Sequence, residues 1–290
     1  MKRRGLTKQQ KRQRALWLAV ALIGGSFALV AALIGVRLSL PAPVLLDEAT
    51  LCPVDGKPRG HTVVVIDKTD FYSAQHVAAI KDWIARKKTG IGEQELLSVR
   101  LLTDRPEDVG QSVFQRCNPG DGKDLKRWWA NPRKAHARWQ ASFGDPLEEA
   151  LGPILSNQET KTSPILEALD VLMWDTAFGP DMPSRTLAIV SDMVQNMPDH
   201  NHYRSIPDVD AFLKTPLGRR LKSRAWQGVK VEIVYLRNVA FNAKQGGAHV
   251  AFWEKLFRKL GVADVKIIPP FELERGIVAA RPAKQGTPRP

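Results

Sequence analysis

The sequence predicts an α/β fold: a doubly wound, mainly parallel sheet with helices on both faces, preceded by one transmembrane helix. Two observations predict it. Short runs rich in β-branched residues alternate with longer amphipathic segments over residues 61–272, as in sheets whose parallel strands are joined by helices. Near the N-terminus, one uncharged apolar stretch is long enough to cross a bilayer.

The N-terminal segment predicts the topology. Residues 1–14 hold seven Lys or Arg side chains and no acid, more than half of the formal net charge of +13. Residues 15–36 carry no charge and would form a helix of about 33 Å. By the positive-inside rule we expect an uncleaved signal anchor in the inner membrane, with a cytoplasmic N-terminus and a periplasmic main domain. A cleaved signal peptide is the alternative, although its apolar region is usually only about 7–15 residues long.

The two cysteines suit an oxidising compartment. Residues 37–60 form a Pro-rich, extended connector that contains Cys52, and Cys117 follows later in RCNPGDG. We expect a Cys52–Cys117 disulfide, the alternative being two unpaired thiols. It would close a loop of about 65 residues and contribute about 4 kcal/mol by the chain-entropy model.

Hydrophobic patterning sets the elements in order. We expect strands at residues 62–67, 96–102, 112–117, 186–192, 229–236 and 265–270. We expect helices at residues 74–87, 163–178, 208–225 and 248–261. Ser163 and Pro164 are typical of a helix start, and Gly261 of a helix end. Residues 273–290 are expected to be a flexible tail.

One long segment interrupts this alternation. Residues 118–160, approximately, contain Trp128, Trp129 and Trp139 and are basic at first. A stacking platform for nucleic acid is one interpretation. A helical insertion that packs its tryptophans onto the domain agrees better with an extracytoplasmic location, so nucleic acid is not an expected partner.

Polar side chains follow two of the expected strands. Asp67 ends the first strand and Asp192 ends the strand at 186–192, while Ser163 begins a helix. In an open parallel sheet, ligands bind beyond the carboxyl ends of the strands, where the strand order reverses. If the first and fourth strands are neighbours, these three groups converge. The acid and histidines of PDHNHY (Asp199, His200, His202) form a weaker candidate for a metal site, because they lie in a loop.

These motifs resemble those of von Willebrand factor A-type (vWA) domains. The family's metal-ion-dependent adhesion site combines a D-x-S/T-x-S strand end, a Thr or Ser opening a later helix, and an Asp ending a later strand. Here Asp67-Lys68-Thr69-Asp70-Phe71 matches the first motif, Ser163 begins S-P-I-L-E-A-L, and Asp192 stands in I-V-S-D-M. The resemblance covers about residues 60–270 in order and spacing.

The resemblance implies a Rossmann-like fold and a site that binds partners without performing a reaction. Mg²⁺ would be held by Asp67, Thr69, Ser163 and Asp192, and an open position on the ion would accept a carboxylate from a protein in an envelope assembly. The chain departs from the motif at Phe71, which replaces a coordinating Ser, and at Met193, which replaces the usual Gly. Ser73 compensates only if the loop is remodelled. Two versions therefore stay open, a metal bridge and a decayed site that docks through helices and the Trp-rich insertion.

A haloacid-dehalogenase-like phosphatase with Asp67 as its nucleophile is the alternative function. Asp67-Lys68-Thr69 matches the D-K-T of the phosphorylation motif D-K-T-G-T found in P-type ATPases. Asp70 and Phe71 replace its last two residues, and Asp192 has no adjacent second acid. We therefore expect a binding module and not an enzyme.

Overall fold

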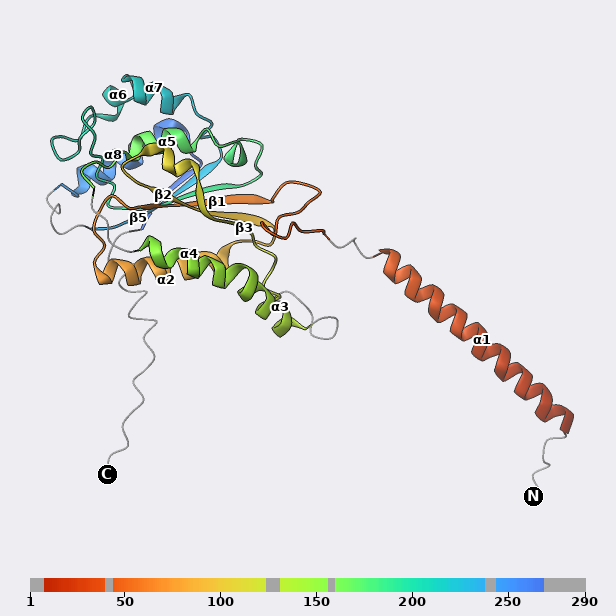
Figure 1. The fold of residues 1–290 in the computed structure, drawn as a ribbon. Helices are drawn as coiled ribbons and strands as arrows, with labels where there is room; N and C mark the ends of the chain where they lie inside the picture. Colours follow the sequence, from red (N-terminus) through yellow and green to blue (C-terminus); the bar gives the residue numbers. More distant parts are fainter. Residues whose placement is uncertain (1–7, 40–43, 124–130, 156–159, 238–243, 269–290) are drawn as a thin grey trace, which may run out of the picture. The chain divides into compact units, whose positions relative to one another are not determined.

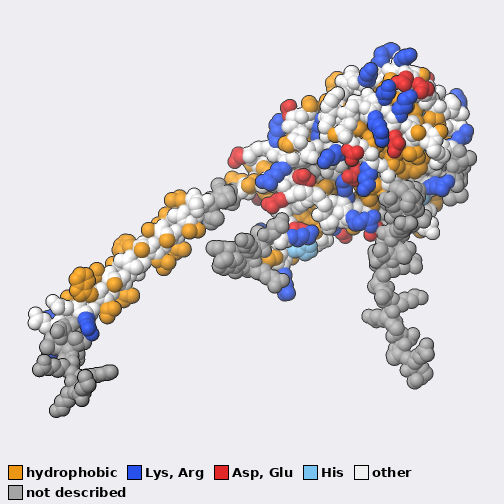
Figure 2. Space-filling view, turned by 180° about the vertical axis from the view of Figure 1, so that it is seen from behind, with side chains coloured by type: hydrophobic (Ala, Val, Ile, Leu, Met, Phe, Trp, Pro, Cys, Tyr) orange, Lys and Arg blue, Asp and Glu red, His pale blue; other side chains and the backbone are white. Residues whose placement is uncertain are grey.

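The computed structural model describes residues 8–39, 44–123, 131–155, 160–237 and 244–268, in two compact units divided between Leu45 and Leu46. The first unit contains helix α1 (Lys8–Ser39). Its stretch Arg12–Ser39 is long and apolar enough to span a membrane, and none of it is buried in the protein. Hydrophobic side chains cover the surface of this helix, whereas charges of both signs intersperse on the second unit (Figure 2). One N-terminal helix therefore fits a single-pass membrane protein.

The second unit is built on a six-stranded sheet of order β3-β2-β1-β4-β5-β6. The strands are β1 (Gly60–Asp67), β2 (Glu95–Leu102), β3 (Ser112–Cys117), β4 (Arg185–Ser191), β5 (Val229–Tyr235) and β6 (Asp264–Ile268). All neighbours are parallel except β2 and β3, which pair antiparallel at one edge. The predicted strands are all present, most with ends shifted by one or two residues; residues 269–270 of the last one lie outside the described part of the chain.

Helices cover both faces of this sheet, so the structure is a mixed α/β fold. One face carries α2 (Ala74–Gly90), α3 (Pro132–Trp139) and α4 (Asp145–Ile154), and the other carries α5 (Ile165–Leu172), α6 (Val209–Phe212), α7 (Pro216–Lys222) and α8 (Gly247–Leu260) (Figure 1). Short helical turns complete it: η1 (Pro106–Gly110), η2 (Gln140–Gly144) and η3 (Thr176–Phe178).

The central strand β1 supplies two hydrophobic cores. All eight of its residues are buried. Val63 and Val65 belong to the core with α5, α7 and α8, and Val64 and Ile66 to the core with α2 and α4. Successive side chains of a strand point to opposite faces, so a continuous apolar run suits a strand covered on both sides.

Two predicted helices are wrong in extent. The segment expected at 163–178 is α-helical only over α5, with the separate turn η3 at its end, and Ser163 lies before α5, in a β-bridge with Asn196. Pro164 occupies the N-cap position and no side chain caps the helix, so the expected capping by Ser163 is not observed. The segment expected at 208–225 is two short helices, because Pro216 has no amide hydrogen to continue α6 and instead begins α7 behind the Thr215 N-cap.

The other two predicted helices are present near their expected bounds, and each has a recognisable cap at one end. Ser73 caps α2, its hydroxyl accepting a hydrogen bond from the His76 amide at 3.1 Å. Helix α8 ends at Gly261, whose φ of 90° is the left-handed conformation that glycine adopts without strain.

The insertion packs against the sheet where the structure describes it. Trp139 is buried beside Phe143 in the core under α2, and its indole nitrogen donates to Asn118 Oδ1 at 2.8 Å. Trp128 and Trp129 lie outside the described residues. The helical-insertion interpretation therefore holds for Trp139, which has no face left for stacking on a nucleotide.

A disulfide joins Cys52 to Cys117, the pairing that the sequence favoured. It attaches the connector to the end of β3, where the Cys117 amide also donates to the Thr50 carbonyl at 2.7 Å. The start of the domain is thereby held against the edge of the sheet.

Candidate metal-binding site at the carboxyl edge of the sheet

The strand order reverses between β1 and β4. The chain runs from β1 outward to β2 and β3, then returns to place β4 on the other side of β1. Asp67 is the last residue of β1, and Asp192 directly follows Ser191, the last residue of β4. Because the two strands are parallel neighbours, both aspartates lie at the same edge of the sheet.

Asp67 is held by hydrogen bonds to both of its carboxylate oxygens. Its Oδ1 accepts from the Thr69 amide at 2.9 Å and the Thr69 hydroxyl at 2.6 Å, and its Oδ2 accepts from the Ser191 hydroxyl at 2.7 Å. The side chain is buried, with the residue 2% exposed. The contact with the Thr69 amide is an Asx turn, which bends the chain out of β1.

Ser163 reaches this cluster from a different element than expected. Its amide and carbonyl pair with those of Asn196 at 3.0 and 2.9 Å, so a bridge to the loop after β4 positions it. Its hydroxyl lies 2.9 Å from that of Thr69. Both residues are buried, so the Thr69 hydroxyl links the Ser163 hydroxyl to the Asp67 carboxylate inside the protein.

Asp192 has one satisfied and one unsatisfied oxygen. Its Oδ1 accepts from the Val194 amide at 2.8 Å, and Gln245 donates to its backbone carbonyl at 3.0 Å. Among the described residues, its Oδ2 has no hydrogen-bond donor, although the residue is only 4% exposed. Buried polar atoms are nearly always paired, so an unpaired carboxylate oxygen indicates a missing cation, proton or water.

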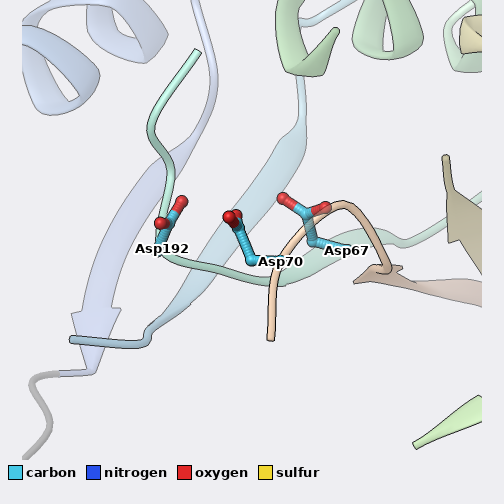
Figure 3. A group of neighbouring side chains, drawn as sticks. All are labelled: Asp67, Asp70 and Asp192. Atoms are coloured by element: carbon cyan, nitrogen blue, oxygen red, sulfur yellow. The ribbon is translucent and has the colours of Figure 1, made fainter. Parts of the chain in front are cut away.

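Asp70 adds a third carboxylate that sequence reasoning missed. Carboxylate oxygens of Asp67, Asp70 and Asp192 all lie within 4.8 Å of one another, and Figure 3 shows Asp70 between the other two. A small pocket opens here, lined by Asp67, Asp70, Phe71, Tyr72, His76, Asp192 and Leu236. The sequence indicated Asp70 only through its acidic side chain. It lies within the motif that begins at Asp67, but at a position where the vWA motif has no ligand.

Burial and mutual repulsion raise the pKa of two of these carboxyls. Burial is the main cause for Asp67, opposed by the hydrogen bonds from Thr69 and Ser191. The pKa of Asp192 lies well above its usual value, first through burial, then through the negative charges of Asp70 and Asp67, and also through a side-chain contact with Asp70 in which the two carboxyls can share a proton. The cluster therefore favours a neutralising species, either a proton or a cation.

The donor set suits a hard divalent cation. Carboxylate and hydroxyl oxygens are the ligands that Mg²⁺ and Ca²⁺ prefer. Of the four predicted ligands, Asp67, Thr69 and Ser163 are joined by hydrogen bonds, and a carboxylate oxygen of Asp192 lies within 4.8 Å of one of Asp67. Phe71 offers no oxygen and is 57% exposed. Ser73 does not replace it, because its hydroxyl caps α2.

The histidines of PDHNHY do not form a site with Asp199. His202 is buried, and its Nδ1 lies 3.2 Å from Nε2 of His249 on α8. His200 instead packs edge-on against Phe212. Burial lowers the pKa of His202 to about 3 and that of His249 to about 4, so both imidazoles are neutral at physiological pH. Within the described residues, only the three aspartates form an acid, His or Cys group compact enough to hold a metal.

No family profile matches this sequence, and no curated protein matches it. Several solved structures are similar to it in part, including two from Bacteroides. One is an aerotolerance-related membrane protein from Bacteroides fragilis with multiple mutations to serines, at 11% identity and a TM-score of 0.36, covering 76% of this chain and 96% of that one. The other is the conserved hypothetical protein BatB from Bacteroides thetaiotaomicron, at 11% identity and a TM-score of 0.37, covering 76% and 98%. With TM-scores below 0.5, we draw nothing on function from either likeness.

Fold and site together define a class: a mixed α/β domain with an oxygen-rich acidic cluster at its switch point, on a chain with one candidate membrane helix.

Proposed function

We propose that this chain is a membrane-anchored, extracytoplasmic vWA-like module that binds a protein partner in the cell envelope through a divalent cation. The observation that carries the proposal is the buried Asp192 Oδ2, which has no donor among the described residues, in a residue whose carboxylate lies near two others. Mg²⁺ is the proposed ion, as the resemblance implies.

Sequence order supports the vWA-like assignment. The three motif segments come from β1, the segment before α5 and the end of β4, and the contacts among Asp67, Thr69 and Ser163 join two of them. In the proposed organisation, residues 1–14 are cytoplasmic, 15–36 span the inner membrane, 37–60 connect, 61–272 form the binding domain and 273–290 form a tail.

Each residue of the site has a definable task. Asp67 and Asp192 would supply negative charge, and the hydroxyls of Thr69 and Ser163 would supply neutral oxygens. The bound ion would offer an open position to an oxygen of the partner. Ser191 and the Thr69 amide orient the Asp67 carboxylate, and the Val194 amide orients that of Asp192.

The phosphatase alternative gains no support from the site. A nucleophilic Asp67 needs an accessible carboxylate oxygen, yet both of its oxygens accept hydrogen bonds and the residue is 2% exposed. A decayed ion site that leaves docking to helices remains the competing version of the binding function, and the following experiment separates the two.

The test is metal-dependent stability of the full chain in detergent micelles. Melting temperature is measured in EDTA and in excess Mg²⁺, Ca²⁺ or Mn²⁺, for the wild type, Asp192→Asn and the control Asp181→Asn. Asp181 is a suitable control because its side chain is 84% exposed and pairs with Lys57 at the surface. A ligand at about 100 times its dissociation constant stabilises the folded state by about 2.7 kcal/mol.

We expect the order of stability of Asp192→Asn and the wild type to depend on metal. In EDTA, Asp192→Asn is more stable than the wild type, because it removes a buried and repelled charge. With metal present, the order reverses, since only the wild type and the control gain stability. If none of the three ions raises the melting temperature of the wild type, the metal site is refuted, and the version with a decayed ion site that docks through helices is favoured.

A further inference from the structure

We infer that Asp70 is a third carboxylate ligand of the proposed cation, and that its charge makes the open position select a neutral oxygen of the partner over a carboxylate. This inference rests on the proposed function and deepens it, because it names the partner chemistry. It also departs from the resemblance, which implies a hydroxyl at position 71 and an acidic partner group.

The geometry places an Asp70 oxygen beside those of Asp67 and Asp192. Asp70 is partly buried, and its carboxylate lies within 4.8 Å of those of Asp67 and Asp192, one on each side of it (Figure 3). Asp192 Oδ2 is the independent sign of a ligand, as a buried oxygen at the same pocket with no donor among the described residues.

The loop after β1 explains why Asp70 takes this role and Phe71 does not. Its start is fixed by the Asx turn at Asp67, and the Thr69 carbonyl accepts from the Thr160 amide at 3.0 Å. Its end is fixed by the Tyr72 hydroxyl, which donates back to the Asp67 carbonyl. Between these anchors, Asp70 and Phe71 both line the pocket, but Phe71 is 57% exposed and its side chain has no oxygen to offer a cation.

Charge then decides what the open position accepts. Two ionised carboxylates neutralise a divalent cation, so a partner carboxylate would leave a net charge of −1. With Asp70 ionised as well, the three carboxylates already leave −1 around the ion, and a partner carboxylate would raise this to −2 in a buried site. None of the described residues that line the pocket is Lys or Arg. A hydroxyl or amide oxygen adds no charge, so a neutral or basic segment fits where an acidic one is repelled.

The experiment measures Mn²⁺ on the full chain in detergent micelles. Free Mn²⁺ is followed by electron paramagnetic resonance for the wild type, Asp70→Asn, Asp70→Ser and the surface control Asp181→Asn. We expect both Asp70 variants to bind Mn²⁺ about 10-fold more weakly or worse, and the control to match the wild type. Asp70→Ser keeps the test decisive if the Asn variant folds poorly.

Acetate serves as the carboxylate probe for the open position. Water-proton relaxation by bound Mn²⁺ falls when acetate displaces a coordinated water. We expect millimolar acetate to leave the wild type unchanged and to lower the relaxation of the double variant Asp70→Ser/Phe71→Ser, in which the vWA hydroxyl pattern is restored.

The possible results separate the two levels of the proposal. A wild type that binds no Mn²⁺ overturns the proposed function itself. A wild type that binds Mn²⁺ no more tightly than Asp70→Asn and Asp70→Ser leaves the proposed function standing and refutes the role of Asp70. Displacement of water by acetate in the wild type refutes the selection against carboxylates.

Discussion

The turn after Asp192 contains a backbone conformation that a methionine rarely adopts. Met193 has φ of 61°, in the left-handed region, at the position where the vWA motif has glycine. Its amide donates to the Ser191 hydroxyl at 2.7 Å and its carbonyl accepts from the Trp253 indole at 3.0 Å. Its side chain is fully buried in the core with α5, α7 and α8. The structure thus keeps the turn that glycine would make and fills the core with a side chain that glycine lacks.

Two substitutions separate the strain from the packing. The left-handed conformation costs a non-glycine residue about 1–2 kcal/mol, and truncating a buried methionine to alanine costs about 2–5 kcal/mol. Met193→Ala loses the packing and keeps the strain. Met193→Gly loses the packing and relieves the strain, against about 0.5–1 kcal/mol for the greater freedom of glycine in the unfolded chain. Both variants are therefore less stable than the wild type, and the glycine variant is more stable than the alanine variant by about 1 kcal/mol.

The assay is urea denaturation of the full chain in detergent micelles, followed by tryptophan fluorescence, with the three proteins compared at one pH. An alanine variant as stable as the glycine variant, or more so, would show that position 193 is not strained. A glycine variant more stable than the wild type would show that the methionine side chain contributes little to the core.

Two further predictions concern the rest of the domain. The double variant Cys52→Ser/Cys117→Ser, which opens a loop between cysteines 65 residues apart, is expected to lose about 4 kcal/mol of unfolding free energy, and an unchanged urea midpoint would contradict this. His61 is buried between the Ala177 carbonyl and the Ser98 hydroxyl, and burial is the main cause that lowers its pKa to about 4. The folded state therefore binds fewer protons than the unfolded state between about pH 4 and 6.5, so stability falls as pH falls through that window. From pH 7 to pH 5 the wild type should lose about 2 kcal/mol more than His61→Gln, and equal losses would refute the linkage.

The local sequence pattern was sufficient to predict a strand or helix where its structure depends on residues within that same segment. The β-branched run ending at Asp67 is typical of a strand buried on both faces, and it became the centre of the sheet. Gly261 ended its helix as expected. The helices over 163–178 and 208–225 were predicted too long. In the first case pairing with Asn196 draws Ser163 into a bridge, and in the second Pro216 within the segment divides it into two helices.

The candidate site was likewise predictable from the sequence only in part. Asp67, Thr69, Ser163 and Asp192 were identified from their order along the chain, together with the expectation that the carboxyl ends of neighbouring parallel strands meet. That β1 and β4 are neighbours is a property of the sheet. Asp70 was visible in the motif, but nothing local shows which way its carboxylate points.

The sequence by itself determined the apolar N-terminal helix, the alternation of strands and helices, and the chemistry available at the strand ends. Each of these depends on residue type and spacing within a short segment. Only the tertiary structure decided that three carboxylates share one pocket, that Met193 takes a left-handed turn, and that most of Phe71 is exposed while Asp70 is partly buried beside Asp67 and Asp192. These outcomes depend on contacts between residues distant in sequence, such as the hydrogen bonds from Ser191 to Asp67 and from Trp253 to Met193. Their geometry exists only once the sheet has brought those segments together.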